Sequence, residues 1–413
     1  MHVETIETAA RLIEIELDWD ELYRRDPSAT VFLSSRFLTS IAFRAMGKFR
    51  ILVAWSDDRT CLGAFPLFVK TRWSKSGNCL YNELDMLGHV FDADYTGILC
   101  DPDHEVAVCE AFAREIQQMS FGLIVLSYFA GPAGRLKTFC SAFDPERFAV
   151  TPCERKINDG KTNNLLCPSV DLPDSFSTYL ASLSTNSRQK LRRLLRQLDS
   201  DPELRITRSR PETFPQDVAL LSELWYLQYA EHKGAKRAAK LTAQFREIIM
   251  VGLANGLIYL AVLWRAGKPV AAQANYVDPV KGHALFHVGG RDETVRDLPV
   301  GLMLQAHCIR WSIAQGLTRY DFTLGNEPYK YSFGAVDREI GCVEIATLSG
   351  TNTTGRLDET SRDDVAEHIR RYVRRGRNDD ARMAARQALQ VWPDLEIACT
   401  VEALIAEAQA KGR

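Results

Sequence analysis

Three features that would place this chain in a special class of protein are missing from it. Its ten cysteines contain no C-x-x-C pair and stand far apart, at positions 61, 79, 100, 109, 140, 153, 167, 308, 342 and 399. This scatter argues against a metal site or a disulfide framework and favours buried free thiols. No apolar run approaches the roughly 18–20 residues that a membrane-spanning helix needs. The N-terminus carries acids and has no basic start, unlike a signal peptide, so we expect a cytoplasmic protein without a membrane partner.

An excess of charge of one sign is also missing. The formal net charge of the 413 residues is −2, which excludes a chain built mainly to coat nucleic acid. With 46% hydrophobic and 25% charged residues, the composition is that of a globular protein. The length exceeds one ordinary core, so two domains of roughly 150 residues are expected.

The expected elements follow the same order in both halves of the chain. Each half shows helices, then a run of antiparallel strands, then a strand–helix–strand unit, although no sequence repeat is recognisable. We therefore predict an α/β protein with tandem domains at residues 1–170 and 171–350, each a mixed, largely antiparallel sheet flanked by helices. Residues 355–413 show only helical periodicity. Trp392 and Leu395 predict that this helical tail packs on another surface, as a lid, a dimer contact or a cap on the second domain.

The stretch 283–334 organises the second half. Residues 283–288 are apolar and aromatic and suit a buried strand, which Gly289-Gly290 ends. Apolar residues then recur at helical spacing from 302 to 313, and Gly316 follows where a left-handed closing residue is expected. Residues 320–322 form a second short strand. The loop and helix start of such a unit direct backbone N–H groups at one spot, and such a spot binds phosphate.

Two arginines flank the expected phosphate-binding loop. Either Arg291 or Arg296 could bind a phosphate through two hydrogen bonds. Local ion pairs with Asp292 and Asp297 on a solvated loop explain the arginines equally well. The expected cofactor-binding residues are Gly290, Arg291, Arg296, Val300 and Gly301.

Several strings of residues are similar to those of a known family. They are Ser187-Arg188-Gln189-Lys190-Leu191-Arg192-Arg193, Pro299-Val300-Gly301, Gln315-Gly316, Tyr320-Asp321-Phe322-x-x-Gly325-x-Glu327-x-Tyr329-Lys330 and, upstream, Asp94-Tyr95-x-Gly97. The chain resembles the acyl-CoA N-acyltransferases of the GNAT superfamily, and among them the BioF2-like, CelD/BcsL acetyltransferases, which are related to Fem-type aminoacyl transferases. The resemblance covers residues 15–348 and implies two GNAT-like domains, with the tail outside it.

One departure from the family pattern concerns the acyl donor. The GNAT pyrophosphate loop has an Arg/Gln-x-x-Gly-x-Gly/Ala pattern, of which this chain keeps only Arg296 and Gly301, at a different separation. Fem-type relatives take their acyl group from aminoacyl-tRNA. The resemblance therefore leaves open whether the donor is acyl-CoA, an acyl carrier or aminoacyl-tRNA.

N-acyl transfer needs a base that takes a proton from the amine and a group that stabilises the oxyanion. The candidate bases are Asp321, Glu327 and His287. A turn or cap that ties down the Gly325 loop explains Asp321 equally well. For His287 a hydrogen-bonded core position is the better explanation, and because no third ligand accompanies it and His283, we expect no metal.

Lys330 and Tyr329 complete the expected catalytic set. Tyr329-Lys330-x-x-Phe333-Gly334 resembles the Fem-type Phe-Lys-x-x-Phe-Gly string, whose lysine lies by the reacting carbonyl. The resemblance thus implies that Lys330 stabilises the oxyanion, and the alternative is a surface lysine packed on Tyr329. Tyr329 could protonate a leaving thiolate, although an aromatic core anchor explains it better.

Substrate-binding residues are expected from both halves of the chain. In two-domain relatives the acceptor lies between the domains, which implies contacts from Asp94 and Tyr95, and His287 and Arg188 complete the set. Arg188 begins a row at i, i+4 and i+8 along one helix face. Such a row is usually only solvated, but it could also steer an anionic acceptor, CoA phosphates or tRNA.

The sequence therefore predicts a GNAT-type acyltransferase that moves groups other than aminoacyl groups. The acyl group would pass from acyl-CoA or an acyl carrier to a small amine, such as an amino sugar, a polysaccharide precursor or a biosynthetic intermediate. A Fem-like enzyme that forms peptide bonds from aminoacyl-tRNA is the first alternative. The second is a non-catalytic module that binds nucleic acid or a partner through the basic helix and the tail.

Overall fold

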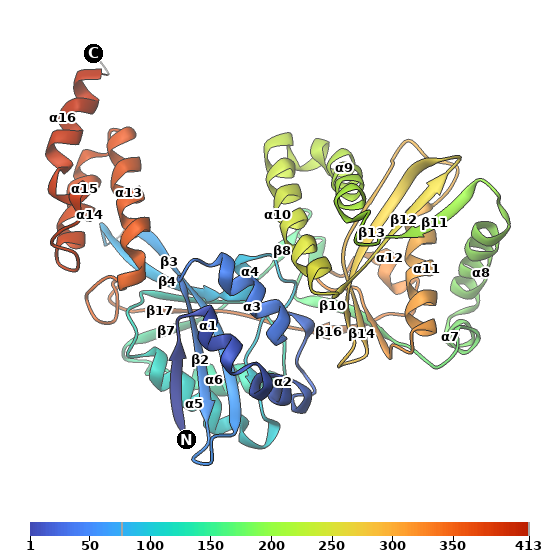
Figure 1. The fold of residues 1–413 in the computed structure, drawn as a ribbon, viewed down its shortest axis with the longest axis horizontal. Coiled ribbons are helices and arrows are strands. Elements are labelled where there is room, and N and C mark those ends of the chain that lie inside the picture. The colour runs from blue at the N-terminus through green and yellow to red at the C-terminus, as the bar shows by residue number, and fades with distance from the viewer. Residues whose placement is uncertain (76, 412–413) are drawn as a thin grey trace.

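The computed structural model describes residues 1–75 and 77–411, in which two mixed β-sheets are flanked by helices (Figure 1). A separate group of helices follows at the C-terminal end. The predicted fold class, two mixed α/β units in tandem with a C-terminal helical extension, is confirmed.

The first sheet combines N-terminal strands with one strand from much later in the chain. Across the sheet the strands are β1 His2–Ile6, β2 Phe49–Trp55, β3 Cys61–Ser74, β4 Cys79–Met86, β6 Leu123–Phe129, β17 Gly341–Thr347 and β7 Phe148–Pro152, with β5 Leu99–Cys100 paired to β3. Successive side chains of β2 enter different cores, because a strand alternates its faces. One face packs against α1 Ala9–Glu14, α2 Glu16–Arg25 and α3 Ser35–Arg44, and the other against α5 Glu105–Ile116 and α6 Ala133–Ser141.

The second sheet has the same layered plan. Its strands, in order across the sheet, are β11 Leu204–Arg208, β12 Ile258–Arg265, β13 Lys268–Asp278, β14 His283–Arg291, β15 Arg319–Asp321, β10 Leu166–Asp171 and β16 Val336–Glu339. One face packs against α7 Phe176–Ser182, α8 Thr185–Ser200 and α11 Val300–Ala314, and the other against α9 Phe214–Lys233 and α10 Ala235–Ala254. In β13, the side chain of Ala271 packs in the core with α7, α8 and α11, and that of Ala272 packs in the core with α9 and α10.

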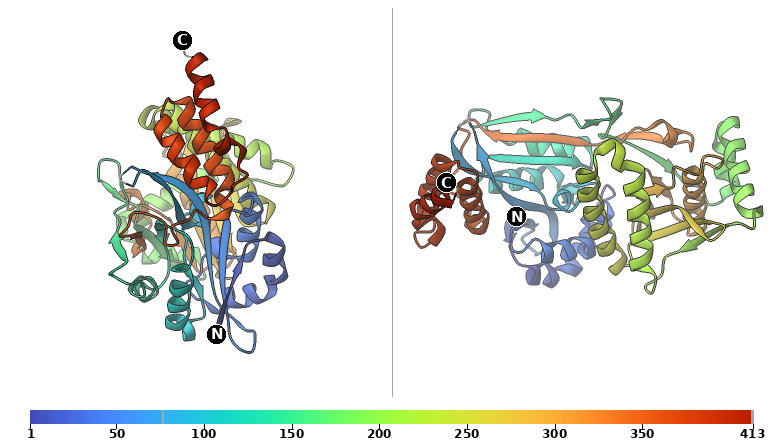
Figure 2. Two further views of the ribbon diagram at one scale, coloured as in Figure 1. Left: turned by 90° about the vertical axis from the view of Figure 1, so that its left-hand side faces the viewer. Right: turned by 90° about the horizontal axis from the view of Figure 1, so that it is seen from above.

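Each sheet contains a strand from the other side of the expected boundary. The strand β10 ends at that boundary, yet it lies between β15 and β16 in the second sheet. The stretch 341–347 was expected as the last strand of the second half, but as β17 it pairs with β6 and β7 of the first sheet. Figure 2 shows the chain passing from one sheet to the other. The expectation for β17 was wrong because an apolar pattern identifies a strand but not its partners. The domain boundaries themselves stay a prediction.

The two units share one apolar core. Phe32 and Phe37 of the first unit pack edge-on against Tyr276 of β13, with ring centroids 4.9 and 6.0 Å apart. Lys281, which follows β13, donates a hydrogen bond to the backbone oxygen of Asp26 at 2.8 Å. Apolar and polar contacts therefore both hold the second sheet against the first unit.

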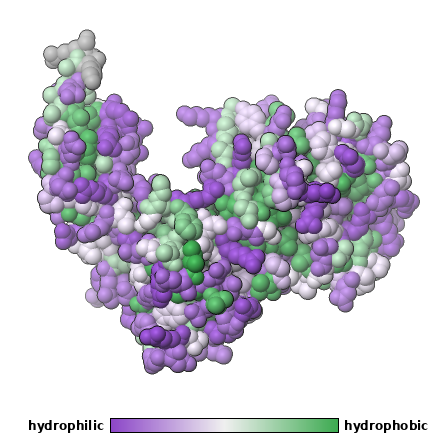
Figure 3. All heavy atoms as spheres, in the orientation of Figure 1, coloured by the Kyte–Doolittle hydropathy of each residue, from purple (hydrophilic) through white to green (hydrophobic). Residues whose placement is uncertain are grey.

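The helical tail packs on the first unit. It consists of α13 Arg362–Arg374, α14 Asn378–Leu389, α15 Glu396–Cys399 and α16 Val401–Lys411. Its core includes Leu80 of β4, and Gln387 exchanges two hydrogen bonds of 2.8 and 2.7 Å with the Leu80 backbone. The sequence left three possibilities for the tail, and one of them, a cap on the second domain, is therefore wrong. In the space-filling view it projects from the molecule, with a hollow between it and α10 (Figure 3).

Candidate functional site

The strand β14 separates from β15 and leaves an opening beside it. The two strands pair in parallel over only three residues, ending at Leu285 and Asp321. Beyond this point β14 continues to Arg291, whereas the segment that follows β15 turns away through Thr323, whose φ is 54°. A β-bulge lies at the same place, because Val288 and Phe286 of β14 pair with consecutive residues of β13 and His287 is extra. Bulges of this kind occur next to active sites.

A pocket of about 260 Å³ lies at this opening. Its walls come from β13, β14, the end of α9, the start of α11 and the loop before Lys330. The lining residues are Gln228, Tyr229, Ala271, Ala272, Gln273, Phe286, Gly289, Gly290, Arg291, Gly301, Leu302, Leu304, Gln305 and Tyr329. Three of the five predicted cofactor-binding residues and one predicted catalytic residue therefore meet in one cavity.

The start of α11 gives this pocket a positive end. The helix begins at Val300, after Pro299, and among the described residues no side chain caps it. The first N–H groups of a helix have no partner within the helix and carry partial positive charge. Gly301 and Leu302 of this first turn line the pocket. A helix start of this kind suits an anion, and the predicted phosphate site stays a prediction.

The other predicted cofactor-binding residues lie in different surroundings. Gly290 lines the pocket, but a Cβ there would stand 2.4 Å from the backbone nitrogen of Trp225, so close packing of α9 also requires glycine. The side chain of Val300 is buried in the core beneath α11 and does not line the pocket. Arg296 is exposed and outside the lining.

The arginine ion pairs differ from those expected. Arg291 lines the pocket and pairs with Glu293 at 2.8 Å, not with Asp292. Asp297 pairs with Arg265 of β12 at 2.8 Å, not with its neighbour in sequence. The expected partners were wrong because the loop curls back toward β12, which local spacing does not reveal.

Lys330 holds the loop that follows β15. Its buried ammonium donates hydrogen bonds of 2.7 Å to the backbone oxygens of Leu324 and Gly325, and it lies 3.0 Å from Glu327 Oε2. The contact with Glu327 is an ion pair without hydrogen-bond geometry, because Glu327 Oε2 has no hydrogen-bond partner among the described residues. Gly325 has a φ of 94°, and a Cβ there would stand 2.8 Å from Glu327 Oε2, so the loop needs glycine at this position. Lys330 is therefore a buried tether and not a surface lysine.

Asp321 is buried at the end of β15. Its Oδ1 accepts hydrogen bonds from the Tyr95 hydroxyl at 2.8 Å and from the Thr323 backbone N–H at 2.7 Å. Burial raises the pKa of Asp321, and these hydrogen bonds lower it in part. Asp321 thus has the turn-capping contact considered from sequence, and it also ties the second sheet to the first unit.

Asp94 makes a second contact of this kind. Its Oδ2 lies 2.7 Å from Nδ1 of His287, whose side chain is only 1% exposed. Among the described residues, Nε2 of His287 has no hydrogen-bond partner. The sequence predicted Asp94, Tyr95 and His287 as substrate contacts, and the structure brings all three to the junction between the units. They do not line the pocket.

Arg188 lies apart from these residues. It is on α8, and its guanidinium donates a 3.4 Å hydrogen bond to the backbone oxygen of Ala181. The apolar side of α8 packs in the core beneath α11. The structure therefore does not bring Arg188 to the pocket.

Four polar lining residues were absent from the predicted set. Gln228 and Tyr229 come from α9, Gln273 from β13 and Gln305 from α11. Gln273 and Gln305 carried a signal, because each is a polar residue at a position that periodicity assigns to the core. The α9 residues carried none, since their role depends on how the helix packs on β14.

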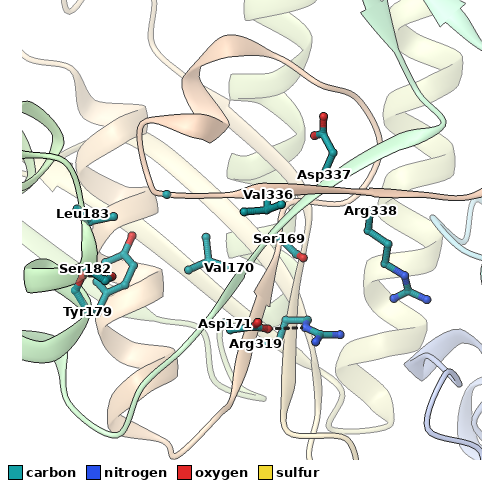
Figure 4. Close-up of a pocket in the computed structure, with 11 residues that line it drawn as sticks. Ser169, Val170, Asp171, Tyr179, Ser182, Leu183, Arg319, Val336, Asp337 and Arg338 are labelled. Carbon is teal, nitrogen blue, oxygen red and sulfur yellow. Dashed lines mark hydrogen bonds and ion pairs between the residues drawn. The ribbon is translucent and has the colours of Figure 1, made fainter.

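A second cavity, of about 430 Å³, lies between α7 and the strands β10, β15 and β16 (Figure 4). Arg319 and Asp171, which are opposite each other on the neighbouring strands β15 and β10, form an ion pair of 3.1 Å in its wall. None of the predicted site residues lines this cavity.

The part of the chain that the structure describes has neither a metal cluster nor a membrane-spanning helix. Among the described side chains, no group of three or more His, Cys, Asp or Glu could hold a metal ion. In the same part of the chain, every helix is too short or too polar to span a bilayer.

Comparison of the sequence with protein families agrees with this geometry. The family described as "Acetyltransferase (GNAT) domain" matches residues 185–331, which include β14, α11 and the Lys330 loop. Residues 185–331 therefore match a GNAT domain, and the resemblance to the GNAT superfamily is confirmed for this part of the chain. Among curated proteins none matches the chain. The narrower relation to the CelD/BcsL group stays a prediction.

Comparison with solved structures concerns the whole fold. The crystal structure of FemX is similar, with 12% identity, a TM-score of 0.57 and coverage of 83% of this chain and 96% of that one. Also similar are a conserved protein of unknown function from Bacteroides thetaiotaomicron, with 16% identity, a TM-score of 0.48 and coverage of 84% and 99%, and a tandem GNAT protein from the clavulanic acid biosynthesis pathway, with 12%, 0.45, 84% and 98%. At such identities the likeness shows the fold alone.

Proposed function

We propose that this GNAT protein transfers an acyl group from acyl-CoA to the amine of a small acceptor, and that the acyl group is not an aminoacyl group. The observation that carries the proposal is the pocket at the uncapped start of α11. Its helix N–H groups and Arg291 suit the phosphates of CoA. The volume of the pocket, about 260 Å³, suits part of a ligand and not a whole CoA molecule.

Groups for the chemistry lie in the pocket wall and next to it, because Tyr329 lines the pocket and Glu327, two residues before it, does not. The amine attacks the thioester carbonyl, a C–N bond forms and the C–S bond breaks. Glu327, beside Tyr329 in the loop and 32% exposed, takes the proton from the amine. Burial raises the pKa of the Tyr329 phenol, and the nearby Glu327 raises it further, so the phenol is protonated and can give its proton to the leaving thiolate.

Lys330 has a positioning role in this proposal. Because its ammonium donates to two backbone oxygens and forms an ion pair with Glu327, it fixes the segment that carries Glu327 and Tyr329. The acceptor would enter at the junction of the units, where Asp94, Tyr95 and His287 meet.

The test is release of free CoA thiol when purified protein is mixed with acyl-CoAs and amines. Tyr329→Phe should lower kcat by about 10²-fold, because general acid catalysis contributes that much. Tyr331→Phe is the matched control, since the Tyr331 hydroxyl is held by Asp337 at 2.6 Å and does not line the pocket. A broad panel of acyl-CoAs that neither bind nor react would refute the proposal. RNase-sensitive activity in an extract would instead support an aminoacyl-tRNA donor.

A further inference from the structure

A buried network of four polar side chains lies beneath the pocket. Tyr320 of β15, Asn275 and Gln273 of β13, and Gln305 of α11 are each at most 3% exposed. The Tyr320 hydroxyl donates to Asn275 Oδ1 at 2.6 Å and accepts from Gln273 Nε2 at 2.8 Å and Gln305 Nε2 at 2.5 Å. Gln273 Nε2 also donates to Asn275 Oδ1 at 2.8 Å.

The backbone fixes the direction of every hydrogen bond in this network. Asn275 Nδ2 lies 3.5 Å from the carbonyl oxygen of Tyr259, which can only accept, so Oδ1 of Asn275 must face Tyr320. A hydroxyl has one proton and two lone pairs. Since the Tyr320 proton goes to Asn275, both lone pairs accept, and Gln273 and Gln305 must each point an amide NH₂ group at Tyr320.

This arrangement leaves the amide oxygens of both glutamines for the pocket. Among the described residues, neither Gln273 Oε1 nor Gln305 Oε1 has a hydrogen-bond partner. Both residues line the pocket, and neither oxygen is among the fully buried polar atoms that lack a partner, so both are accessible from the cavity. The two oxygens are therefore open acceptors for a hydrogen-bond donor of a ligand.

The position of the glutamines assigns this donor to the inner part of the ligand. Gln305 is four residues after Gly301, which is about 6 Å along a helix. Gln273 pairs with Gly289, two residues inward from the pairing of Ala271 with Arg291, about 7 Å along a strand. The phosphate-binding end thus lies outside and the two oxygens lie deeper.

The charge of the lining decides which donor fits. The lining side chains, all within the described part of the chain, include Arg291 but no carboxylate. Burial of an ammonium group without a counter-charge is costly. A neutral hydroxyl supplies a donor without this cost.

We propose that the pocket selects a short acyl group that bears a hydroxyl, held by the amide oxygens of Gln273 and Gln305. This inference rests on the proposed acyl-CoA-dependent function and names its substrate class as hydroxyacyl. An unsubstituted acyl chain of the same length leaves both oxygens unpaired, and sites built for a hydroxyl discriminate strongly against such analogues.

The experiment compares matched donors in the full-length protein, lactoyl-CoA with propionyl-CoA and β-hydroxybutyryl-CoA with butyryl-CoA. At least one hydroxylated donor should have a kcat/KM about tenfold or more above that of its partner. Gln273→Met and Gln305→Met should each bring this ratio toward one. Gln228→Met is the matched control for the ratio, because Gln228 lines the same pocket but its Oε1 already accepts from the Arg291 N–H at 3.2 Å.

The outcomes separate this inference from the proposed function. Equal kcat/KM values within both pairs of donors, in the wild-type protein, would overturn the hydroxyacyl assignment and leave the acyl-CoA function intact. An amide N–H of the CoA arm could supply the same donor. If the Gln→Met variants weaken the binding of free CoA as much as that of hydroxyacyl-CoA in calorimetric titration, the CoA arm contacts the glutamines and the assignment fails. If neither acyl-CoA nor free CoA binds, the function and the inference fail together.

Discussion

The two ends of the unit at residues 283–334 use their polar groups in opposite ways. At the start of α11 no described side chain caps the helix, and Arg296 on the preceding loop has no ion-pair partner among the described residues. In the loop after β15, the Lys330 ammonium donates to two backbone oxygens, and Oδ1 of Asp321 accepts two hydrogen bonds. The first end thus has polar groups available to a ligand, whereas the polar groups of the second end stabilise the loop itself.

This difference separates a ligand site from its scaffold. The sequence strings that most resemble the family lie at the satisfied end, where a substitution should affect stability first. The end that departs from the family pattern has the open geometry, where a substitution should affect affinity first. Substitutions at the two ends should therefore differ in which property they change and by how much.

Lys330→Met should have the largest effect. The substitution keeps the length of the side chain but leaves two backbone oxygens and Glu327 without their partner. We expect the free energy of unfolding to fall by about 3 kcal/mol in urea denaturation, because breaking a buried charge contact is costly. Lys156→Met, which removes an exposed ion pair with Glu154, is the control and should change little. Unchanged stability with lost activity would contradict the tether and favour the oxyanion role that the resemblance implies.

Gly290→Ala and Gly301→Ala form a matched pair on the pocket wall. A Cβ on Gly290 would stand 2.4 Å from the Trp225 nitrogen, whereas one on Gly301 would meet nothing closer than Arg291 Cδ at 3.4 Å. Gly290→Ala should therefore lower the free energy of unfolding by about 2 kcal/mol through overpacking. Gly301→Ala should leave thermal stability unchanged and weaken CoA binding in calorimetric titration. Equal loss of stability in both variants would argue against the division.

His307, in the middle of α11, should make stability depend on pH. Burial lowers its pKa from the usual 6.5 to about 4, and the nearby Arg310 contributes. The unfolded chain then binds a proton near pH 6.5 that the folded chain binds only near pH 4, so stability is lost as the pH falls through this window. We expect this group to contribute about 1–2 kcal/mol of that loss, after allowing for partial solvent access.

The measurement is urea denaturation between pH 7 and pH 4.5. His307→Gln should flatten the profile. Burial also lowers the pKa of His283 to about 4. A double variant that replaces both His307 and His283 should therefore have a still flatter profile of stability against pH. A wild-type slope retained in the double variant would contradict the assignment.

Asp321→Asn should have the smallest effect. The asparagine oxygen can accept the same hydrogen bonds from Tyr95 and Thr323, and the raised pKa of Asp321 shows that burial disfavours its charge. We expect a change in the free energy of unfolding below about 1 kcal/mol and most of the acyltransfer activity retained. Loss of activity by about 10²-fold at unchanged stability would instead make Asp321 the base.

Local features of the fold could be predicted from the sequence. Helical spacing located α11, and Gly316 has the left-handed φ of 72° expected at its end. The three strands β12 to β14 follow from apolar runs separated by turn residues. The expected end of β14 at Gly289-Gly290 was wrong, because the strand continues through both glycines to Arg291. Pro299 and Gly301 located the start of α11. These features depend on residues that are neighbours in the sequence.

Contacts between distant residues could not be predicted. The pairing of Asp94 with His287 joins residues 193 positions apart, and that of Tyr95 with Asp321 joins residues 226 apart. The sheet to which β17 belongs and the docking of the tail on Leu80 depend equally on the complete fold. A single sequence shows that Gln273 is polar in a buried strand, but only the packed structure shows that its oxygen faces a cavity.

The position of β17 has a consequence for how the protein is made. This strand fills the gap between β6 and β7, so the first sheet stays open until residue 347 has left the ribosome. Until then the unpaired edges of β6 and β7 are exposed, which favours mispairing with other chains. The N-terminal unit therefore cannot finish folding during its own synthesis, and the second unit must be present before the first is complete.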